Sequence, residues 1–168
     1  MKKLINPRKI KIGCMDSRSD GYVHIDIDPA TNPDITADCQ NMFMIKDNSV
    51  EEIVCEMVME HIPDTLKVMK EFHRVLKPNG ILKIVTVHAL NVNLYSVPDH
   101  IKGFTYTTFN QFWQSGHLNY PKFRCKKRRI TTRNKHMQWL PDRFPLVAER
   151  LFWLIQLDGI EAELEAIK

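Results

Sequence analysis

The stretch that decides the fold is Lys9-Ile-Lys-Ile-Gly-Cys-Met-Asp-Ser-Arg-Ser-Asp-Gly-Tyr-Val-His-Ile-Asp-Ile-Asp28. Two short apolar runs, 10–12 and 23–27, flank a polar turn, and the second run ends in carboxylates. In an α/β sheet, a tight turn after the first strand lets a ligand approach the backbone. An acid at the end of the second strand accepts hydrogen bonds from ribose hydroxyls. Gly13 is followed by Cys14, Met15 and Asp16, so the glycine pattern alone indicates such a nucleotide pocket only weakly.

Length and composition predict one domain over residues 1–168. A chain of 168 residues can bury a core without metal or disulfide support. Its 43% hydrophobic and 26% charged residues are ordinary for a globular protein. Four widely spaced cysteines (Cys14, Cys39, Cys55, Cys125) form no metal-binding pattern and indicate reduced thiols. Because no apolar stretch has the length of a signal peptide or membrane span, we expect a cytoplasmic protein.

The order of apolar runs predicts a mostly parallel sheet. Strands are expected over 9–13, 22–27, 34–38, 52–58 and 81–87, with a helix that begins at Pro63–Asp64 before the last of them. Residues 14–21 are too few for a crossover helix between parallel strands, so the first crossover is expected to be a loop. The helix N-terminus that binds phosphate would then be missing, which predicts a nucleoside ligand without pyrophosphate.

Several motifs occur together in a recognisable order. They are Ile12-Gly-Cys-Met15, Gly21-Tyr-Val-His-Ile-Asp-Ile-Asp-Pro29, Ala37-Asp38, Asp47-Asn-Ser-Val-Glu-Glu-Ile-Val54, Val58-Met-Glu-His-Ile62 and Arg74-Val-Leu-Lys-Pro-Asn-Gly80. Together they resemble the class I S-adenosylmethionine-dependent methyltransferases, in particular a compact subgroup of the methyltransferase type 11 kind. The resemblance covers roughly 9–90, and Asp99-His100 with Phe104-Thr-x-x-Thr-Phe109 resembles a segment common after the subgroup's fifth strand.

The resemblance implies a Rossmann-like, mostly parallel sheet of about seven strands with an antiparallel C-terminal strand. Residues 9–90 would be the cofactor-binding half and 91–168 the substrate side. The residues themselves predict a short helix over 107–115 and a strand or hairpin arm over 122–133, and a strand is expected over 160–167. A helix is expected within 141–157, with an apolar side made of Leu146, Val147, Arg150, Leu151 and Leu154. The composition of 160–167 favours a helix, but its alternation and the family pattern favour a strand.

The resemblance also implies which residues bind S-adenosylmethionine. Gly13, Cys14 and Met15 would lie against its methionine part, and Asp26, followed by Ile27, would bind the ribose in preference to Asp28. Asp38 and Cys39 would meet the adenine edge, while Glu56 and Met57 would border the methionine and the cationic sulfonium, which a carboxylate favours. The family usually has glycine where this chain has Met15. Two functions therefore remain open: an active methyltransferase, or a degenerate methyltransferase fold that serves as a binding or partner subunit.

The methyl acceptor is unidentified, and the sequence predicts neither a metal site nor a nucleophilic triad. We expect the acceptor to enter near His61, His88 and 104–113. Glu60, His61 and His88 are the candidate catalytic residues. A structural role is the alternative for each: Glu60 and His61 can fix a loop, and a histidine after a strand is often structural. Methyl transfer requires orientation and at most one base.

Positive charge is concentrated in residues 122–135, which hold eight Lys/Arg and no acid. Subtracting these eight charges from the net charge of +4 leaves −4 for the remainder. If 160–167 is a neighbouring strand, Glu161, Glu163 and Glu165 share one face and partly neutralise the stretch. The alternative is that Lys126, Lys127, Arg128 and Arg129 bind nucleic acid such as RNA. The sequence does not predict the oligomeric state.

Overall fold

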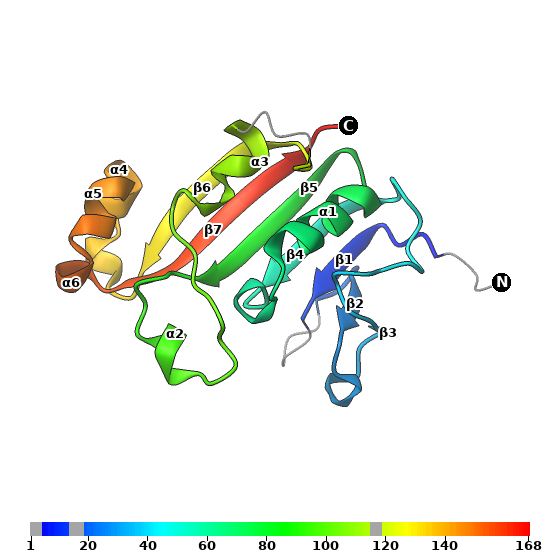
Figure 1. The fold of residues 1–168 in the computed structure, drawn as a ribbon, viewed down its shortest axis with the longest axis horizontal. Helices are drawn as coiled ribbons and strands as arrows, with labels where there is room; N and C mark the ends of the chain where they lie inside the picture. The colour runs from blue at the N-terminus through cyan, green and yellow to red at the C-terminus, as the bar shows by residue number, and fades with distance from the viewer. Residues whose placement is uncertain (1–4, 14–18, 115–118) are drawn as a thin grey trace.

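A computed structural model describes residues 5–13, 19–114 and 119–168, which form an α/β sheet with helices (Figure 1). Seven strands make up the sheet: β1 (Lys9–Ile12), β2 (Val23–Asp26), β3 (Ile35–Thr36), β4 (Val50–Glu56), β5 (Leu76–Val87), β6 (Phe123–Thr132) and β7 (Leu157–Ala166). Their spatial order is β3-β2-β1-β4-β5-β7-β6. Strands β1 to β5 pair in parallel, and β7 is antiparallel to both β5 and β6. The predicted fold class is confirmed.

The link between β1 and β2 runs over residues 13–22, and the two strands are parallel neighbours. Residues 19–22 contain no helix, while residues 14–18, where the loop in place of a crossover helix is predicted, lie outside the described residues. The chain goes from β1 outward to β2 and β3, and then returns to β4 on the other side of β1. This reversal places a topological switch point between β1 and β4, where open α/β sheets bind ligands.

The helices are short except for one. They are α1 (Thr65–Val75), α2 (Asn93–Ser96), α3 (Gln111–Gln114), α4 (Trp139–Arg143), α5 (Pro145–Arg150) and α6 (Phe152–Ile155), with 3₁₀ helices η1 (Pro29–Thr31), η2 (Met59–His61), η3 (Thr108–Asn110) and η4 (Lys135–Met137). Helix α1 begins where predicted, because the Asp64 side chain accepts a hydrogen bond from the Lys67 backbone N–H at 2.9 Å. Its buried face (Val68, Met69, Phe72, Val75) packs into the core. None of the described helices is long and apolar enough to cross a membrane.

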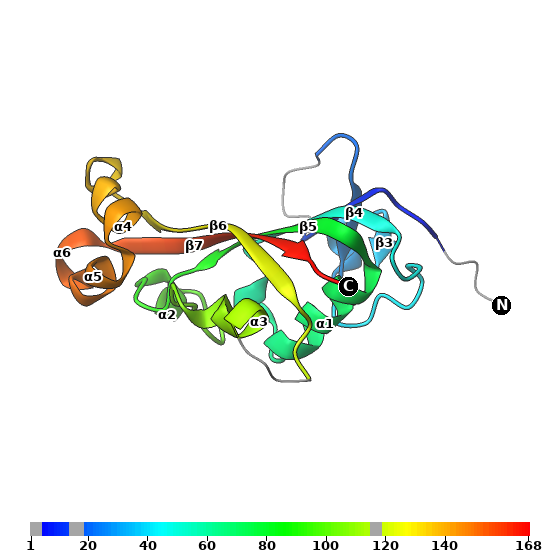
Figure 2. The ribbon, with the colours of Figure 1, turned by 90° about the horizontal axis from the view of Figure 1, so that it is seen from above.

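Among the described residues, the longest helix, α1, and helix α3 pack on the same face of the central sheet. Figure 2 shows α1 and α3 on one side of the sheet, while α4 lies on the other side at the far end of β6 and β7. Buried apolar residues such as Ile53, Leu82 and Leu164 form the core. Most alternate positions of these strands carry long charged side chains, and the apolar Val54, Ile81 and Val85 occupy others. A parallel sheet is usually covered on both faces. We call the other face of this sheet, on which the charged side chains lie, the open face.

Cross-strand ion pairs occupy the open face. Lys11 Nζ lies 3.3 Å from Glu56 Oε2, and Lys9 and Lys83 lie 3.6 and 2.8 Å from opposite oxygens of Glu52. Tyr22 also donates a hydrogen bond to Glu52, and this bond is the main cause that raises the pKa of Tyr22 to about 12. The stems of these residues cover apolar surface while their charges neutralise one another.

The same face explains most of the basic stretch. Strand β7 pairs with β6, so Arg124 and Lys126 lie 3.6 and 3.3 Å from Glu165, and Arg129 lies 3.6 Å from Glu161. The predicted strand over 160–167 and its neutralising role are confirmed. On the opposite face, the guanidinium of Arg128 stacks 3.7 Å from the ring centre of Tyr106. Lys127 is exposed, and nucleic-acid binding through this stretch stays a prediction.

The predicted helix within 141–157 is wrong in extent and in orientation. Three short helices replace it, and Leu146, Val147 and Leu154 of the predicted apolar side are exposed, while Ala148 and Ile155 are buried. The break has a local cause, because Pro145 restricts the residue before it and donates no backbone hydrogen bond. Phe144 accordingly has the non-helical angles φ −137° and ψ 67°.

Candidate active site

Strand register brings three of the predicted cofactor residues to one level. Ile12 of β1 is paired with Ile25 of β2 and with Cys55 of β4. The next residues are Gly13, Asp26 and Glu56, at the carboxyl edge of three adjacent strands that are about 4.8 Å apart. Gly13 therefore lies between Asp26 and Glu56, beside the switch point. Cys14 and Met15 lie outside the described residues.

Gly13 occupies a position that only glycine fits. Its φ is +81°, and its N–H donates to the Ile25 carbonyl at 3.0 Å. A Cβ at this position would lie 2.5 Å from Cγ2 of Val58. The backbone can therefore leave β1 close to the end of β4 without a side chain that intrudes on the edge.

Asp26 is the last residue of β2 and is partly buried. Its Oδ1 accepts from the Asp28 N–H at 2.9 Å, which orients the carboxyl group at the strand end. Ile27 is 70% exposed, and Asp28 is also exposed and caps η1 through the Ala30 N–H at 2.8 Å. The geometry thus distinguishes the two acids: Asp26 belongs to the edge and Asp28 to the next turn.

Asp38 and Cys39 begin the loop between β3 and β4. Asp38 Oδ1 accepts from the Gln40 N–H at 2.8 Å and from Gln40 Nε2 at 3.3 Å, so the carboxyl group helps to fix the loop. Cys39 is buried, and burial together with the charge of Asp38 raises the pKa of its thiol to about 12. The thiol is therefore protonated near neutral pH and is no nucleophile there.

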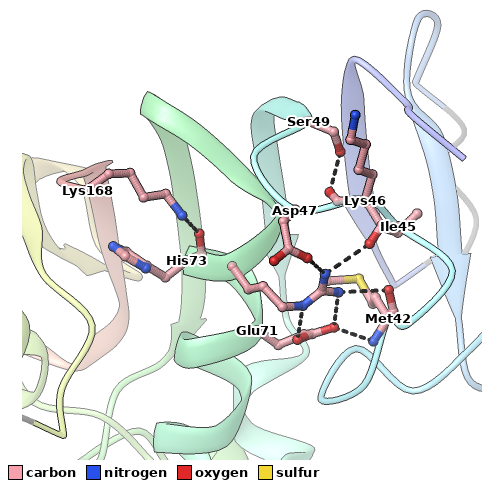
Figure 3. A network of polar contacts seen from close by, with 9 residues as sticks. Met42, Ile45, Lys46, Asp47, Ser49, Glu71, His73 and Lys168 are labelled. Atoms are coloured by element: carbon pink, nitrogen blue, oxygen red, sulfur yellow. Dashed lines mark hydrogen bonds and ion pairs between the residues drawn. The ribbon is translucent and has the colours of Figure 1, made fainter. Parts of the chain in front are cut away.

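Arg74, near the end of α1, holds this loop in place. Figure 3 shows the acceptors gathered around its guanidinium: Glu71 at 2.7 and 2.8 Å, the Met42 carbonyl at 2.9 Å, the Ile45 carbonyl at 3.0 Å, and Asp47. Glu71 in turn accepts from the Met42 N–H at 2.6 Å. The bonds to Glu71 and Asp47 raise the pKa of Arg74 further above its ordinary value. Sequence analysis gave Arg74 only as part of a motif, and its structural role is to position the loop that carries Asp38.

Glu56 and Met57 end β4 in different ways. The Glu56 side chain points toward the open face, where it pairs with Lys11. Met57 is half-exposed and has a φ of +50°, an uncommon conformation for a residue other than glycine. Its N–H still donates to the Val85 carbonyl at 2.8 Å. The chain turns sharply at Met57, immediately beside Gly13, and such strained residues concentrate at functional sites.

His88 follows β5 as predicted, but it is fully buried and bonded at both ring nitrogens. Nδ1 accepts from the Leu90 N–H at 3.1 Å, and Nε2 lies 3.1 Å from Glu149 Oε1. Burial lowers the pKa of His88, an effect that the adjacent Glu149 carboxylate opposes. This geometry favours a structural link between β5 and α5. Phe104, Phe109 and Phe112 of the expected acceptor segment are also buried, in stacked or tilted ring contacts.

Glu60, His61 and His100 lie together beside the end of β4. Glu60 is fully buried, and its Oε2 accepts from Thr86 Oγ1 at 2.8 Å. His61 Nδ1 lies 3.2 Å from Asp99 Oδ2, and its ring meets the His100 ring edge-on at 4.8 Å between centres. The quoted motifs 58–62 and 99–100 are therefore in contact, which chain spacing alone did not reveal.

A cleft opens next to the end of β5. It has a volume of about 180 Å³ and is lined by Leu90, Asn91, Val92, Arg133, Gln156, Leu157 and Asp158. Asn91 Nδ2 donates to the Asp158 carbonyl at 2.7 Å and fixes one wall. The cleft has four polar lining residues, Asn91, Arg133, Gln156 and Asp158, beside the apolar Leu90, Val92 and Leu157. Sequence analysis did not identify these residues, because they come from three separate segments.

This strand order, with antiparallel β7 and a glycine at the switch point, defines the fold of the class I methyltransferases. Residues 17–84 match the family model described as "Methyltransferase domain", so the predicted resemblance is confirmed.

Solved structures agree with this assignment of the fold. The YcgJ protein from Bacillus subtilis is 13% identical, with a TM-score of 0.65 over 99% of this chain and 94% of the other. A SAM-dependent methyltransferase from Archaeoglobus fulgidus is 13% identical, with a TM-score of 0.69 over 94% and 85%. Geranyl diphosphate C-methyltransferase from Streptomyces coelicolor, in complex with Mg²⁺, geranyl diphosphate and S-adenosyl-L-homocysteine, is 10% identical, with a TM-score of 0.64 over 99% and 76%. No curated protein matches the chain by sequence.

Proposed function

We propose that the chain is a methyltransferase that uses S-adenosylmethionine as its methyl donor. The observation that carries this proposal is the level arrangement of Gly13, Asp26 and Glu56 at the carboxyl edge of β1, β2 and β4. It places a bare backbone between an acid suited to ribose hydroxyls and a second acid on the neighbouring strand. The methyltransferase match over 17–84 and the cofactor product held by the Streptomyces coelicolor neighbour support the same donor.

The described residues fit the donor at its two ends. Gly13 has no side chain, and its backbone leaves β1 beside the end of β4, which suits the methionine part. Asp26 accepts from the ribose hydroxyls, and the loop fixed by Arg74 presents Asp38 and the Cys39 backbone to the adenine edge. When bound, S-adenosylmethionine supplies a methyl group on a cationic sulfonium. Glu56 ends β4 beside Gly13, and because its carboxylate is paired with Lys11 on the open face, little of its negative charge remains to offset that positive charge.

The acceptor side lies toward β5 and β7. We infer that the cleft bordered by Arg133 and Asp158 receives the acceptor, since it opens at the same edge of the sheet as Gly13. Its small volume suits one functional group of an acceptor better than a whole drug-sized molecule. The chain's role in the reaction is to orient the acceptor and exclude water, which can supply a large part of the rate of a methyl transfer.

Calorimetric titration tests this proposal most directly. S-adenosylhomocysteine, which has no methyl group to transfer, is titrated into the full chain, with adenosine diphosphate as the comparison ligand. We expect saturable binding of one S-adenosylhomocysteine per chain and weaker binding of the diphosphate. Absence of heat at protein concentrations near 0.1 mM, an order-of-magnitude choice that detects dissociation constants up to roughly that value, would overturn the proposal. The degenerate-fold alternative predicts that same absence of heat.

A further inference from the structure

We propose that Glu60, His61 and His100 form a binding site for a divalent transition-metal ion of the Zn²⁺ type. One ligand atom from each side chain lies within 4.8 Å of the other two. Glu60 and His61 belong to η2 after β4, whereas His100 belongs to the segment between α2 and η3. The site goes beyond the methyl transfer proposed above and does not depend on it.

Glu60 supplies the first indication of a ligand. The Glu60 side chain is fully buried, and its Oε2 accepts a hydrogen bond from Thr86 Oγ1. Oε1 is buried as well, and it accepts no hydrogen bond from any residue that the structure describes. An ionised carboxyl group buried without a partner is costly, and native proteins rarely leave such an atom unsatisfied. A cation beside Oε1 removes this cost.

His61 is oriented as metal-binding histidines commonly are. Its Nδ1 lies 3.1 Å from the Asp99 carbonyl oxygen and 3.2 Å from the Asp99 carboxylate. A proton on Nδ1 is donated to these acceptors, which leaves the lone pair on Nε2. Metal-ligating histidines typically donate their second ring nitrogen to a carboxylate or carbonyl in this way. Asp99 therefore acts as the positioning residue for His61.

His100 completes the set. Its Nδ1 is buried and has no hydrogen-bond partner within 5–13, 19–114 and 119–168. The His61 and His100 rings meet at 70°, so their nitrogens can approach a common point. The Ile101 N–H donates to the Glu60 carbonyl at 3.0 Å, which ties the two segments together directly beside the three side chains. The backbone thus holds the ligands close before any ion binds.

The donor set selects the kind of ion. Two imidazole nitrogens and one carboxylate oxygen suit Zn²⁺ and similar ions better than Mg²⁺ or Ca²⁺, which prefer oxygen ligands. In a tetrahedral site with ligands about 2.1 Å from the ion, neighbouring ligand atoms are about 3.4 Å apart. Binding would thus draw these side chains together by about 1 Å relative to the observed spread. Three protein ligands leave a fourth position for water or another ligand.

The test measures Zn²⁺ binding by the full chain after treatment with a chelator. We expect one high-affinity Zn²⁺ per chain by calorimetry, and a visible absorption spectrum of tetrahedral Co²⁺ in its place. Glu60→Gln, His61→Ala and His100→Ala should each lose this binding. Gln keeps an acceptor for Thr86, so Glu60→Gln removes the charge and preserves the packing. Asp99→Asn should weaken binding by about 10- to 100-fold, as loss of an orienting partner does.

His136→Ala is the matched control, because His136 is an exposed histidine of η4, away from the three ligands in the chain. It should bind Zn²⁺ as the wild type does. Thermal melting of each variant without metal establishes that it is folded. Absence of stoichiometric Zn²⁺ in the wild type overturns the proposal, as does equal binding by His61→Ala and His100→Ala. Titration of S-adenosylhomocysteine is a separate readout, so failure of the metal site and failure of the methyltransferase proposal are distinguishable.

Discussion

Asp26→Asn tests whether the end of β2 binds the cofactor ribose. The substitution exchanges one carboxylate oxygen for an amide and removes the charge, while Oδ1 remains an acceptor. The Asp28 N–H, which is 2.9 Å from Oδ1, can keep its hydrogen bond. Strand β2 is otherwise untouched, so the change acts on ligand binding far more than on folding.

The expected loss follows from the hydrogen bonds that a carboxylate accepts. Hydrogen bonds to a charged group contribute about 1.5–3 kcal/mol. A carboxylate can accept from both ribose hydroxyls, whereas the asparagine amide offers one oxygen that already serves the Asp28 N–H. We therefore expect the dissociation constant of S-adenosylhomocysteine to rise by about 10- to 150-fold.

The assay is calorimetric titration, with Asp28→Asn as the matched control. Asp28 is exposed and caps η1 through the Ala30 N–H, and asparagine caps equally well. The control should change the binding free energy by less than about 0.5 kcal/mol. Wild-type affinity in Asp26→Asn, or an equal loss in Asp28→Asn, would refute the assignment of the ribose to Asp26. Both variants should melt at the wild-type temperature, which separates binding from stability.

Three further predictions concern the same half of the chain. Met15→Gly should raise the affinity for S-adenosylhomocysteine in calorimetry, and unchanged affinity would show that Met15 does not crowd the ligand. Arg74→Lys should lower the free energy of unfolding in urea by about 2 kcal/mol, because lysine cannot reproduce its bidentate hydrogen bonds; an unchanged midpoint would contradict that role. Burial lowers the pKa of His73 and His88 in the folded protein. The unfolded chain therefore binds more protons at these two histidines than the folded chain does below about pH 6.5. The free energy of unfolding should therefore fall from pH 7 to 5.5, with a smaller fall in His88→Gln than in the wild type.

The elements near the switch point were predictable because their signals are local. Alternation identified β2, helical spacing with an Asp64 cap identified α1, and a run of apolar residues identified β5. Residues 160–167 show where tertiary context overrides propensity: Glu161 and Glu165 have cationic neighbours on β6, and a strand satisfies them. The register of Gly13 with Asp26 and Glu56 follows from strand order, so this part of the site was also within reach of the sequence.

Other features depend on contacts that sequence spacing does not encode. His61 and His100 are distant in the chain, and a turn of irregular backbone brings them together. The acceptor cleft likewise combines Asn91, Arg133 and Asp158 from three segments. The error over 141–157 is of a different kind, because Pro145 was visible in the sequence. Its effect on Phe144 outweighed the apolar periodicity that suggested one helix.

The open face shows how charged side chains cover one side of the mostly parallel sheet of this compact chain. Such sheets usually bury both faces under apolar layers. Here the positions that would meet a second helical layer carry Lys11, Glu52, Lys83 and Glu161, and most of these charges are paired across strands. Each such pair at an exposed position contributes only about 0–1 kcal/mol to the free energy of unfolding. Their main effect is on solvation, because the charged side chains and their stems leave less apolar surface that requires a helix to cover it. In the described residues, the links between β2, β3 and β4 contain no α-helix, and the charged strand positions compensate for that absence. The carboxyl edge of the sheet is left to the ligand.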